Sequence, residues 1–319
     1  MLLTPQVLTI DILNLIFVIF ASLAFYFSAK IVYRYDNNAT TTLQYSLEKQ
    51  SYLVAVIIKF IFYSKIVLFI FFIFTLDNIS NILPGAMCAA GVVNATVYGN
   101  YLLILKIINL YIFGYWLVLN HEDMKSEKQL YLKFKFKVYI FAYFLLMIEI
   151  GLESVMFFSI DTKSVVDCCG AIFSTTDGTY MARLLNVSPT ILLGSFYGIY
   201  ALILFFYIIK NRYLFSLMNL LFVIVALISL ISFFGTYIYE LPTHHCPFCL
   251  LQKDYNYVGY FLYIFLFIGT FFGIIIGVIP FQKEEENSKY KISLFFTTLY
   301  VLSVSYYPLA YFLKNGVWL

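Results

Sequence analysis

Two cysteines separated by two residues stand directly after a pair of histidines, in the run His244-His245-Cys246-Pro247-Phe248-Cys249. Cysteines at this spacing can form a small disulfide that exchanges readily. A helix start or a nearby imidazole lowers the pKa of such a thiol and makes the thiolate nucleophilic. The attacking thiol is usually the N-terminal one, which is Cys246 here. The motif therefore predicts a redox-active dithiol.

The same residues also suit a soft metal ion. Thiolate and imidazole groups are ligands for copper, zinc or mercury. His244, His245, Cys246 and Cys249 are thus candidate metal ligands. Their set could be completed by Cys88 with Met87 or by the Cys168-Cys169 pair. A third interpretation is a static disulfide that joins two loops. The sequence leaves all three interpretations open.

The remaining cysteines bear on disulfide exchange. Cys168 and Cys169 are neighbours, and a disulfide between neighbours closes a strained ring, so pairing elsewhere is favoured. One of them could bond Cys88, which would leave the other able to attack a Cys246–Cys249 disulfide. The alternative is that one of the five cysteines is unpaired and inert.

Four charged residues fall inside apolar segments and form a second candidate site. Glu149 and Glu153 are spaced i, i+4 and share one face of a predicted helix. Counting from the loops places Glu149 and Lys65 near the middle of the bilayer, and Glu153 and Lys106 nearer its outer face. A charge at such a depth needs a partner or a water-filled cavity. The two hypotheses are a proton or ion path and a set of salt bridges that fixes helix packing.

Membrane helices must position these residues. The chain has 319 residues, of which 62% are hydrophobic, 21% aromatic and only 12% charged. A soluble domain carries about 25% charged residues and has too little interior to bury so much apolar surface. Apolar runs long enough to span a bilayer predict eight transmembrane helices, at 7–29, 51–76, 99–119, 138–160, 189–209, 214–238, 257–279 and 293–313. The predicted fold is an all-α polytopic membrane protein.

Lysine and arginine in the loops predict the orientation of these helices. One set of alternating loops holds thirteen Lys and Arg residues and the opposite set holds four. The richer set is expected on the cytoplasmic side, so both chain termini and all five cysteines lie outside. In a bacterial inner membrane, the cysteine loops would face the oxidising periplasm.

Two of the cysteine loops predict an internal repeat. Leu83-Pro84 precedes Cys88 as Leu241-Pro242 precedes Cys246, with three residues between Pro and Cys in both loops. Each loop lies between the second and third helices of a four-helix half. We therefore expect one membrane domain, 1–319, and one hypothesis is a parallel 4+4 repeat with halves 1–188 and 189–319. The alternative is a chance likeness, because Leu-Pro before a loop is common.

The run Cys246-Pro247-Phe248-Cys249-Leu250-Leu251, at the outer end of a predicted membrane helix, resembles the redox motif of bacterial vitamin K epoxide reductase homologues. More loosely, it resembles that of periplasmic disulfide-generating quinone reductases. Those families pass electrons from a periplasmic thiol partner, through a loop cysteine pair, to a Cys-x-x-Cys and then to quinone. The resemblance implies that Cys246 and Cys249 match the pair next to the quinone.

Two functional hypotheses follow. The first is a membrane thiol–disulfide oxidoreductase or electron-transfer protein with an outer-face Cys-x-x-Cys, and the resemblance implies quinone as its cofactor. The second is a membrane protein for soft-metal binding, transport or metalloprotein maturation, with Cu, Zn or Hg as its metal. The expected partners are membrane lipids and a periplasmic thiol protein or metalloprotein. The net charge of only +3 gives no reason to expect nucleic acid.

Overall fold

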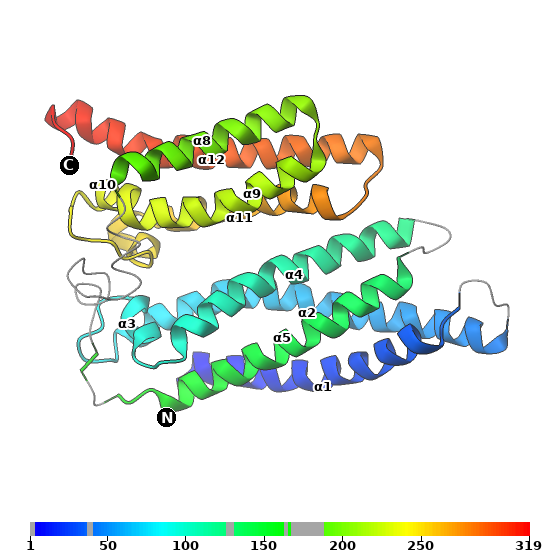
Figure 1. Ribbon diagram of the computed structural model, residues 1–319. Coiled ribbons are helices and arrows are strands. Elements are labelled where there is room, and N and C mark those ends of the chain that lie inside the picture. The colour runs from blue at the N-terminus through cyan, green and yellow to red at the C-terminus, as the bar shows by residue number, and fades with distance from the viewer. Residues whose placement is uncertain (1–3, 37–40, 126–130, 163–164, 167–187) are drawn as a thin grey trace. The chain divides into compact units, whose positions relative to one another are not determined.

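The computed structural model describes residues 4–36, 41–125, 131–162, 165–166 and 188–319 (Figure 1). These residues form helices and no strands, so the predicted all-α class is confirmed. The α-helices are α1 (Pro5–Arg34), α2 (Thr42–Ser80), α3 (Ala89–Asn94), α4 (Gly99–Lys125), α5 (Leu132–Ser159), α8 (Pro189–Ile209), α9 (Arg212–Ser229), α10 (Gly235–Tyr239), α11 (Val258–Val278) and α12 (Lys283–Asn315).

Eight helical segments of the described chain are long and apolar enough to cross a membrane. They are α1, α2, α4, α5, α8, α11 and α12, together with the continuous run of α9, a π-helical turn η1 (Leu230–Phe234) and α10. The protein is therefore a multi-pass membrane protein. The sidedness predicted from lysine and arginine stays a prediction.

The chain separates into two compact units, Met1–Val166 and Asp167–Leu319, and each is described by itself. Unit 1 holds α1 to α5, and unit 2 holds α8 to α12. The predicted repeat boundary after residue 188 differs from the boundary between the units by residues 167–188, of which 167–187 lie outside the described residues.

Both units have the same cyclic order of long helices. In unit 1, α1 and α4 each contact α2 and α5. In unit 2, α8 and α11 each contact α9 and α12. An internal repeat would give this order, and so would any antiparallel four-helix bundle. The repeat therefore stays a prediction.

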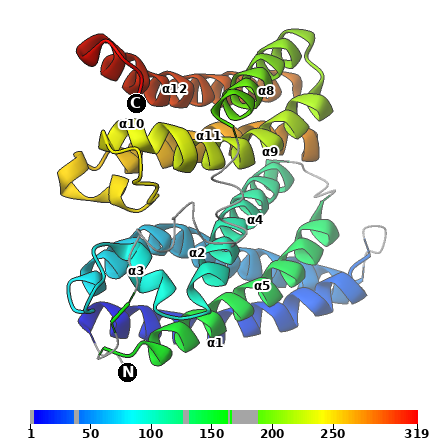
Figure 2. The same cartoon turned by 60° about the vertical axis from the view of Figure 1, so that its left-hand side comes forward.

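Unit 1 has two distinct ends (Figures 1 and 2). One end, which we call the α3 end, contains the short helix α3. At this end α1 and α4 begin and α2 and α5 finish. At the other end, which we call the lysine-rich end, α1 connects to α2 and α4 connects to α5. Arg34, Lys125, Lys133 and Lys135 belong to this second end.

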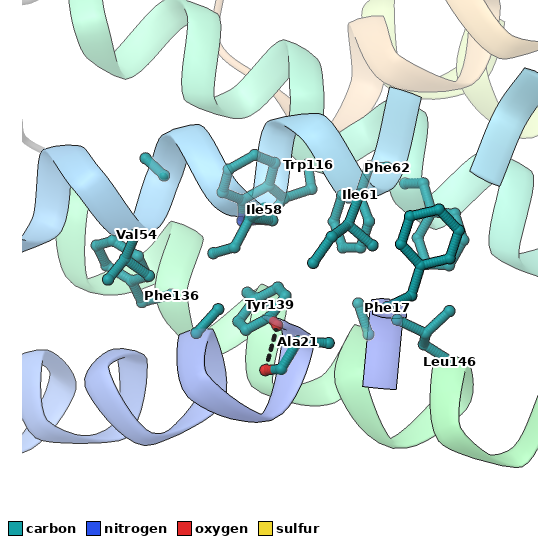
Figure 3. Packing of buried hydrophobic residues seen from close by; sticks show 14 of the residues in the cluster. Phe17, Ala21, Val54, Ile58, Ile61, Phe62, Trp116, Phe136, Tyr139 and Leu146 are labelled. Atoms are coloured by element: carbon teal, nitrogen blue, oxygen red, sulfur yellow. Dashed lines mark hydrogen bonds between the residues drawn. The ribbon is translucent and has the colours of Figure 1, made fainter. Parts of the chain in front are cut away.

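An aromatic and aliphatic core fills the half of unit 1 toward the lysine-rich end (Figure 3). The rings of Phe62 and Phe113 stack with their centroids 4.3 Å apart, and Trp116 meets Phe62 edge-on at 5.4 Å. Tyr139 donates its hydroxyl hydrogen to the carbonyl oxygen of Ala21 at 2.8 Å. These rings are fully buried, and their polar atoms are paired, as a buried polar group requires.

Helix ends follow local chemistry. The side chains of Thr4, Thr41 and Asn211 each accept a hydrogen bond from a backbone N–H in the first turn of α1, α2 and α9. Such residues are preferred at this position because the first four N–H groups of a helix lack partners. Gly316 ends α12 with φ 72°, a conformation that favours glycine.

Two charged segments that lie outside the predicted spans 138–160 and 293–313 are helical. Lys135 lies in α5, buried, with its ammonium 2.7 Å from the carboxylate of Asp123. Its charge is tolerated there because this ion pair neutralises it. The acidic run Glu284-Glu285-Glu286 forms the first turn of α12 rather than a loop. Negative charges stabilise that position because the helix dipole is positive at the N-terminus.

Candidate functional site

The loop that carries the Cys-x-x-Cys begins where α10 stops. Glu240 has φ 52°, and the Leu241 N–H donates to the carbonyl of Thr236 at 3.0 Å. This is a common way to finish a helix, and Pro242 prevents the helix from continuing. Residues 243–248 then cross the end of unit 2 to the short 3₁₀ helix η2 (Cys249–Leu251).

The two thiols of this loop are close together and buried. The sulfur atoms of Cys246 and Cys249 lie within 4.8 Å of one another. Cys246 is 1% exposed and Cys249 is 6% exposed. Cys249 opens η2, where the Gln252 N–H donates to its carbonyl at 3.0 Å. A disulfide requires sulfurs about 2.05 Å apart, so the two sulfurs have to move toward each other to form one.

Two tyrosines hold the backbone between the cysteines. Tyr239, the last residue of α10, donates its hydroxyl hydrogen to the carbonyl of Cys246. Tyr263 of α11 donates to the carbonyl of Pro247 at 2.8 Å. A buried carbonyl left without a donor costs about 1–3 kcal/mol. These two bonds therefore fix the loop to two membrane helices.

The histidines are occupied by other contacts. The Nδ1 of His245 lies 3.1 Å from the carbonyl oxygen of Ile231, which belongs to η1. Turns of π-helix often occur at functional sites because they alter the regular backbone bonding of a helix. The ring of His244 meets Tyr239 edge-on, with centroids 4.4 Å apart.

This arrangement bears on the predicted four-ligand metal site. Among the described residues of unit 2, neither His244 nor His245 belongs to a group of three or more close His, Cys, Asp or Glu ligand atoms. The two sulfurs are together, and the imidazoles are not grouped with them. The geometry therefore favours a two-thiol site over a His₂Cys₂ site.

A third tyrosine, Tyr255, packs against Tyr239 beside this loop. The ring of Tyr255, in the 3₁₀ helix η3 (Lys253–Tyr255), packs edge-on against Tyr239 with centroids 4.6 Å apart. Burial raises the pKa of the Tyr255 phenol, and the negative charges of a Cys249 thiolate and of Asp254 add to the increase. Tyr255 is therefore a neutral hydrogen-bond donor at neutral pH.

Tyr255 also lines a pocket of about 330 Å³ in unit 2, whose wall includes Ile238, Asp254, Asn256, Phe261 and Tyr307. Asn256 and its neighbour Tyr257 both adopt positive φ, 55° and 56°. Backbone strain of this kind concentrates at binding and active sites. The pocket is separated from the Cys246 loop by Tyr255 and Tyr239.

The other predicted cysteines are placed differently. Cys88 is buried at the start of α3 in unit 1, where the Gly91 N–H donates to its carbonyl at 3.0 Å. Cys168 and Cys169 lie outside the described residues. A pairing of Cys88 with either of them, and a role for Cys88 beside Cys246, stay predictions.

The four buried charges of unit 1 form one network. The ammonium of Lys106 lies 2.9 Å from Glu149 and 2.8 Å from Glu153. The ammonium of Lys65 lies 2.9 Å from Glu149 and 3.9 Å from Glu153. Each ammonium group thus lies within 4.0 Å of both glutamates, and the predicted depths in the bilayer stay a prediction. Each of the four residues is at most 5% exposed.

Two asparagines complete this network, and the sequence reasoning missed them. Asn14 of α1 donates to Glu153 at 2.8 Å and accepts from Lys65 at 3.3 Å. Asn109 of α4 donates to Glu149 at 2.5 Å. Their signal was available, because an amide inside an apolar span is as unusual as a charge.

Taken together, the fold and the Cys246 loop define a multi-pass α-helical membrane protein with a buried dithiol at the end of one helical unit. No protein-family model matches the chain, and neither a curated protein nor a solved structure matches it.

Proposed function

We propose that the protein is a membrane thiol–disulfide oxidoreductase or electron-transfer protein in which Cys246 and Cys249 are the active dithiol. The observation that carries this proposal is the proximity of their two sulfurs, within 4.8 Å, in a loop that Tyr239 and Tyr263 hold by its carbonyls. A dithiol in a fixed loop can close and open a disulfide without rearrangement of the helices around it.

The chemical step is an exchange with a disulfide of a partner. The Cys246 thiolate attacks one partner sulfur, a mixed disulfide forms, and the other partner sulfur leaves as a thiolate. The Cys249 thiolate then attacks Cys246, which closes the Cys246–Cys249 disulfide and releases the second partner sulfur. Two electrons pass to the partner, which becomes a dithiol after taking up two protons. The reverse reaction oxidises a dithiol partner.

The electron acceptor or donor inside the membrane is proposed by resemblance. The vitamin K epoxide reductase homologues that share the Cys-Pro-Phe-Cys run pass electrons to quinone. A quinone would take two electrons and two protons from the Cys246–Cys249 dithiol and become a quinol. The lysine and arginine distribution supports a periplasmic position for this loop in a bacterial inner membrane, with a periplasmic thiol protein as partner.

Cys88, Cys168 and Cys169 are proposed to supply the second thiol pair. Five cysteines allow one pair at Cys246 and Cys249, one further pair and one remaining thiol. In this scheme Cys88 bonds one member of the 168/169 pair, and the other member attacks the active disulfide. The variants Cys168→Ser and Cys169→Ser, made separately, identify which of the two has each role.

A soft-metal function is the second candidate. Two thiolates within 4.8 Å suit Cu(I), which binds readily to thiolates alone. Metal analysis of protein purified under reducing conditions separates the two functions. Stoichiometric copper or zinc that disappears in Cys246→Ser and Cys249→Ser would favour the metal function.

A redox titration tests the proposed function. Purified full-length protein is equilibrated with graded ratios of reduced and oxidised dithiothreitol, quenched with acid and labelled with a mass-tagged maleimide. We expect a two-thiol transition of the Cys246–Cys249 pair that is lost in Cys246→Ser and kept in Cys88→Ser, where Cys88 can no longer form the second pair. A Cys246–Cys249 pair that stays oxidised at every ratio would be a structural disulfide, and the proposal would be wrong.

A further inference from the structure

The buried ionic network of unit 1 lies beside one further carboxylate. Asp11, three residues before Asn14 in α1, is half-buried, and its charge repels that of Glu153. Among the residues that the structure describes, no donor pairs with the buried Oδ1 of Asp11. A buried carboxylate oxygen without a donor is costly, and a proton on this carboxyl group would remove that cost.

The number of charged groups in the cluster also favours a protonated carboxyl group. The cluster contains three carboxyl groups, from Asp11, Glu149 and Glu153, but only two ammonium groups, from Lys65 and Lys106. These five residues come from α1, α2, α4 and α5 and are joined by the ion pairs and the charge repulsion given above. With all groups ionised, the cluster would carry one net negative charge inside the membrane. Hydrocarbon strongly disfavours a net charge, so one carboxyl group is expected to take up a proton.

The cluster also has room for water. A cavity lined by Asn14, Lys65, Lys106, Glu149 and Glu153 offers about 10 Å³ to the centre of a water molecule. A water molecule needs about 10–15 Å³ measured in this way and two to four polar partners. One water molecule between the ammonium and carboxylate groups would connect them for proton transfer.

Buried apolar side chains lie on both sides of the network along the helices. Phe72 and Phe157 pack together toward the α3 end, with ring centroids 6.2 Å apart, and the aromatic core lies toward the lysine-rich end. On α1, Asp11 is nearer the α3 end than Asn14, and the core residues Phe17 and Ala21 are farther from it. The other three helices repeat this order, with Phe62, Trp116 and Tyr139 on the lysine-rich side of the charges. Figure 3 shows Phe62, Trp116 and Tyr139 packed together with other apolar side chains of this core.

From this arrangement we infer that unit 1 contains a proton-binding site enclosed by apolar side chains. The cluster of three carboxyl and two ammonium groups holds one proton at neutral pH. Uptake of the proton converts one carboxylate and one hydronium ion into a carboxylic acid and water, and it makes the cluster neutral. The inference does not depend on the chemistry of the cysteines.

Infrared spectroscopy tests the charge count. The carbonyl stretch of a protonated carboxylic acid is recorded at neutral pH on the full-length protein in a detergent without ester groups. We expect one protonated carboxyl group in the parent protein, none in Asp11→Asn or Glu153→Gln, and two in Lys65→Met. The matched control Glu122→Gln removes a carboxylate that pairs with Lys125 outside the cluster, and it should leave the count at one.

The two isosteric variants decide the outcome even if Lys65→Met does not fold. Absence of the signal from the parent protein would overturn the inference, and so would a signal that persists in both Asp11→Asn and Glu153→Gln. Enclosure of the site is tested in liposomes under an imposed potential, where proton flux should equal that of protein-free vesicles. A flux several-fold higher that Glu153→Gln abolishes would show that the apolar side chains do not enclose the site.

Discussion

Tyr239 donates its hydroxyl hydrogen to the backbone carbonyl of Cys246, seven residues further along the chain. The bond connects the last residue of a membrane-spanning segment to the first cysteine of the candidate dithiol. The phenol ring also contacts His244 and Tyr255. Tyr239 is therefore the side chain that joins the loop, the upstream histidine and the neighbouring 3₁₀ helix.

Removal of this hydroxyl should loosen the loop. Tyr239→Phe keeps the ring and leaves the buried Cys246 carbonyl without its donor, which costs about 1–3 kcal/mol. We expect a lower midpoint of thermal unfolding and faster alkylation of reduced Cys246. The control Tyr257→Phe changes a tyrosine that is 50% exposed and should alter neither value. Equal effects of the two variants would show that the Tyr239 hydroxyl does not hold the loop.

The buried ion pairs of unit 1 should show strong coupling. Lys65→Leu removes the ammonium that lies 2.9 Å from Glu149, and breaking a buried pair costs about 3–5 kcal/mol. The double variant Lys65→Leu with Glu149→Leu removes both charges and should recover much of that loss. Thermal unfolding of both single variants and the double variant measures the coupling as a double-mutant cycle. Additive losses would mean that the two charges do not depend on each other.

The close contact between α11 and η2 gives a third prediction, which concerns stability and the reactivity of Cys249. A Cβ atom on Gly259 would lie 2.8 Å from the side chain of Leu250, next to Cys249. Gly259→Ala should therefore cost about 1–3 kcal/mol by overpacking and should change the reactivity of Cys249. In α8, Gly198 has no atom within 4 Å of such a Cβ. Gly198→Ala should be neutral or stabilise the protein by about 0.5–1 kcal/mol, and equal losses in the two variants would refute the contact.

The eight spans could be predicted from the sequence because lipid requires long apolar helices. The ends were less predictable, since helices continue past the apolar run. The second span was predicted from residue 51, whereas α2 begins at Thr42. Lys135 was assigned to a loop because its charge is visible in the sequence, whereas its burial against Asp123 depends on tertiary packing.

In the candidate sites, too, some features could be predicted from the sequence and others depend on the fold. The i, i+4 spacing placed Glu149 and Glu153 on one helix face, and the structure brings both lysines to that face. Tyr239 and Tyr263 could not be identified, because 29 tyrosines look alike until the fold shows which carbonyl each one reaches. The cysteine spacing was visible from the start, but the separation of the histidines from the sulfurs was not.

Capture of a mixed disulfide tests the proposed dithiol most directly. Full-length Cys249→Ser protein in membranes is exposed to glutathione disulfide, quenched with acid and analysed by mass spectrometry. We expect glutathione on Cys246 that a reductant releases, and no adduct at residue 246 or 249 in Cys246→Ser or in the double variant. The parent protein should show a Cys246–Cys249 disulfide instead of an adduct. If glutathione never attaches to Cys246 in Cys249→Ser, or attaches equally to Cys249 in Cys246→Ser, then Cys246 is not the attacking thiol that we propose.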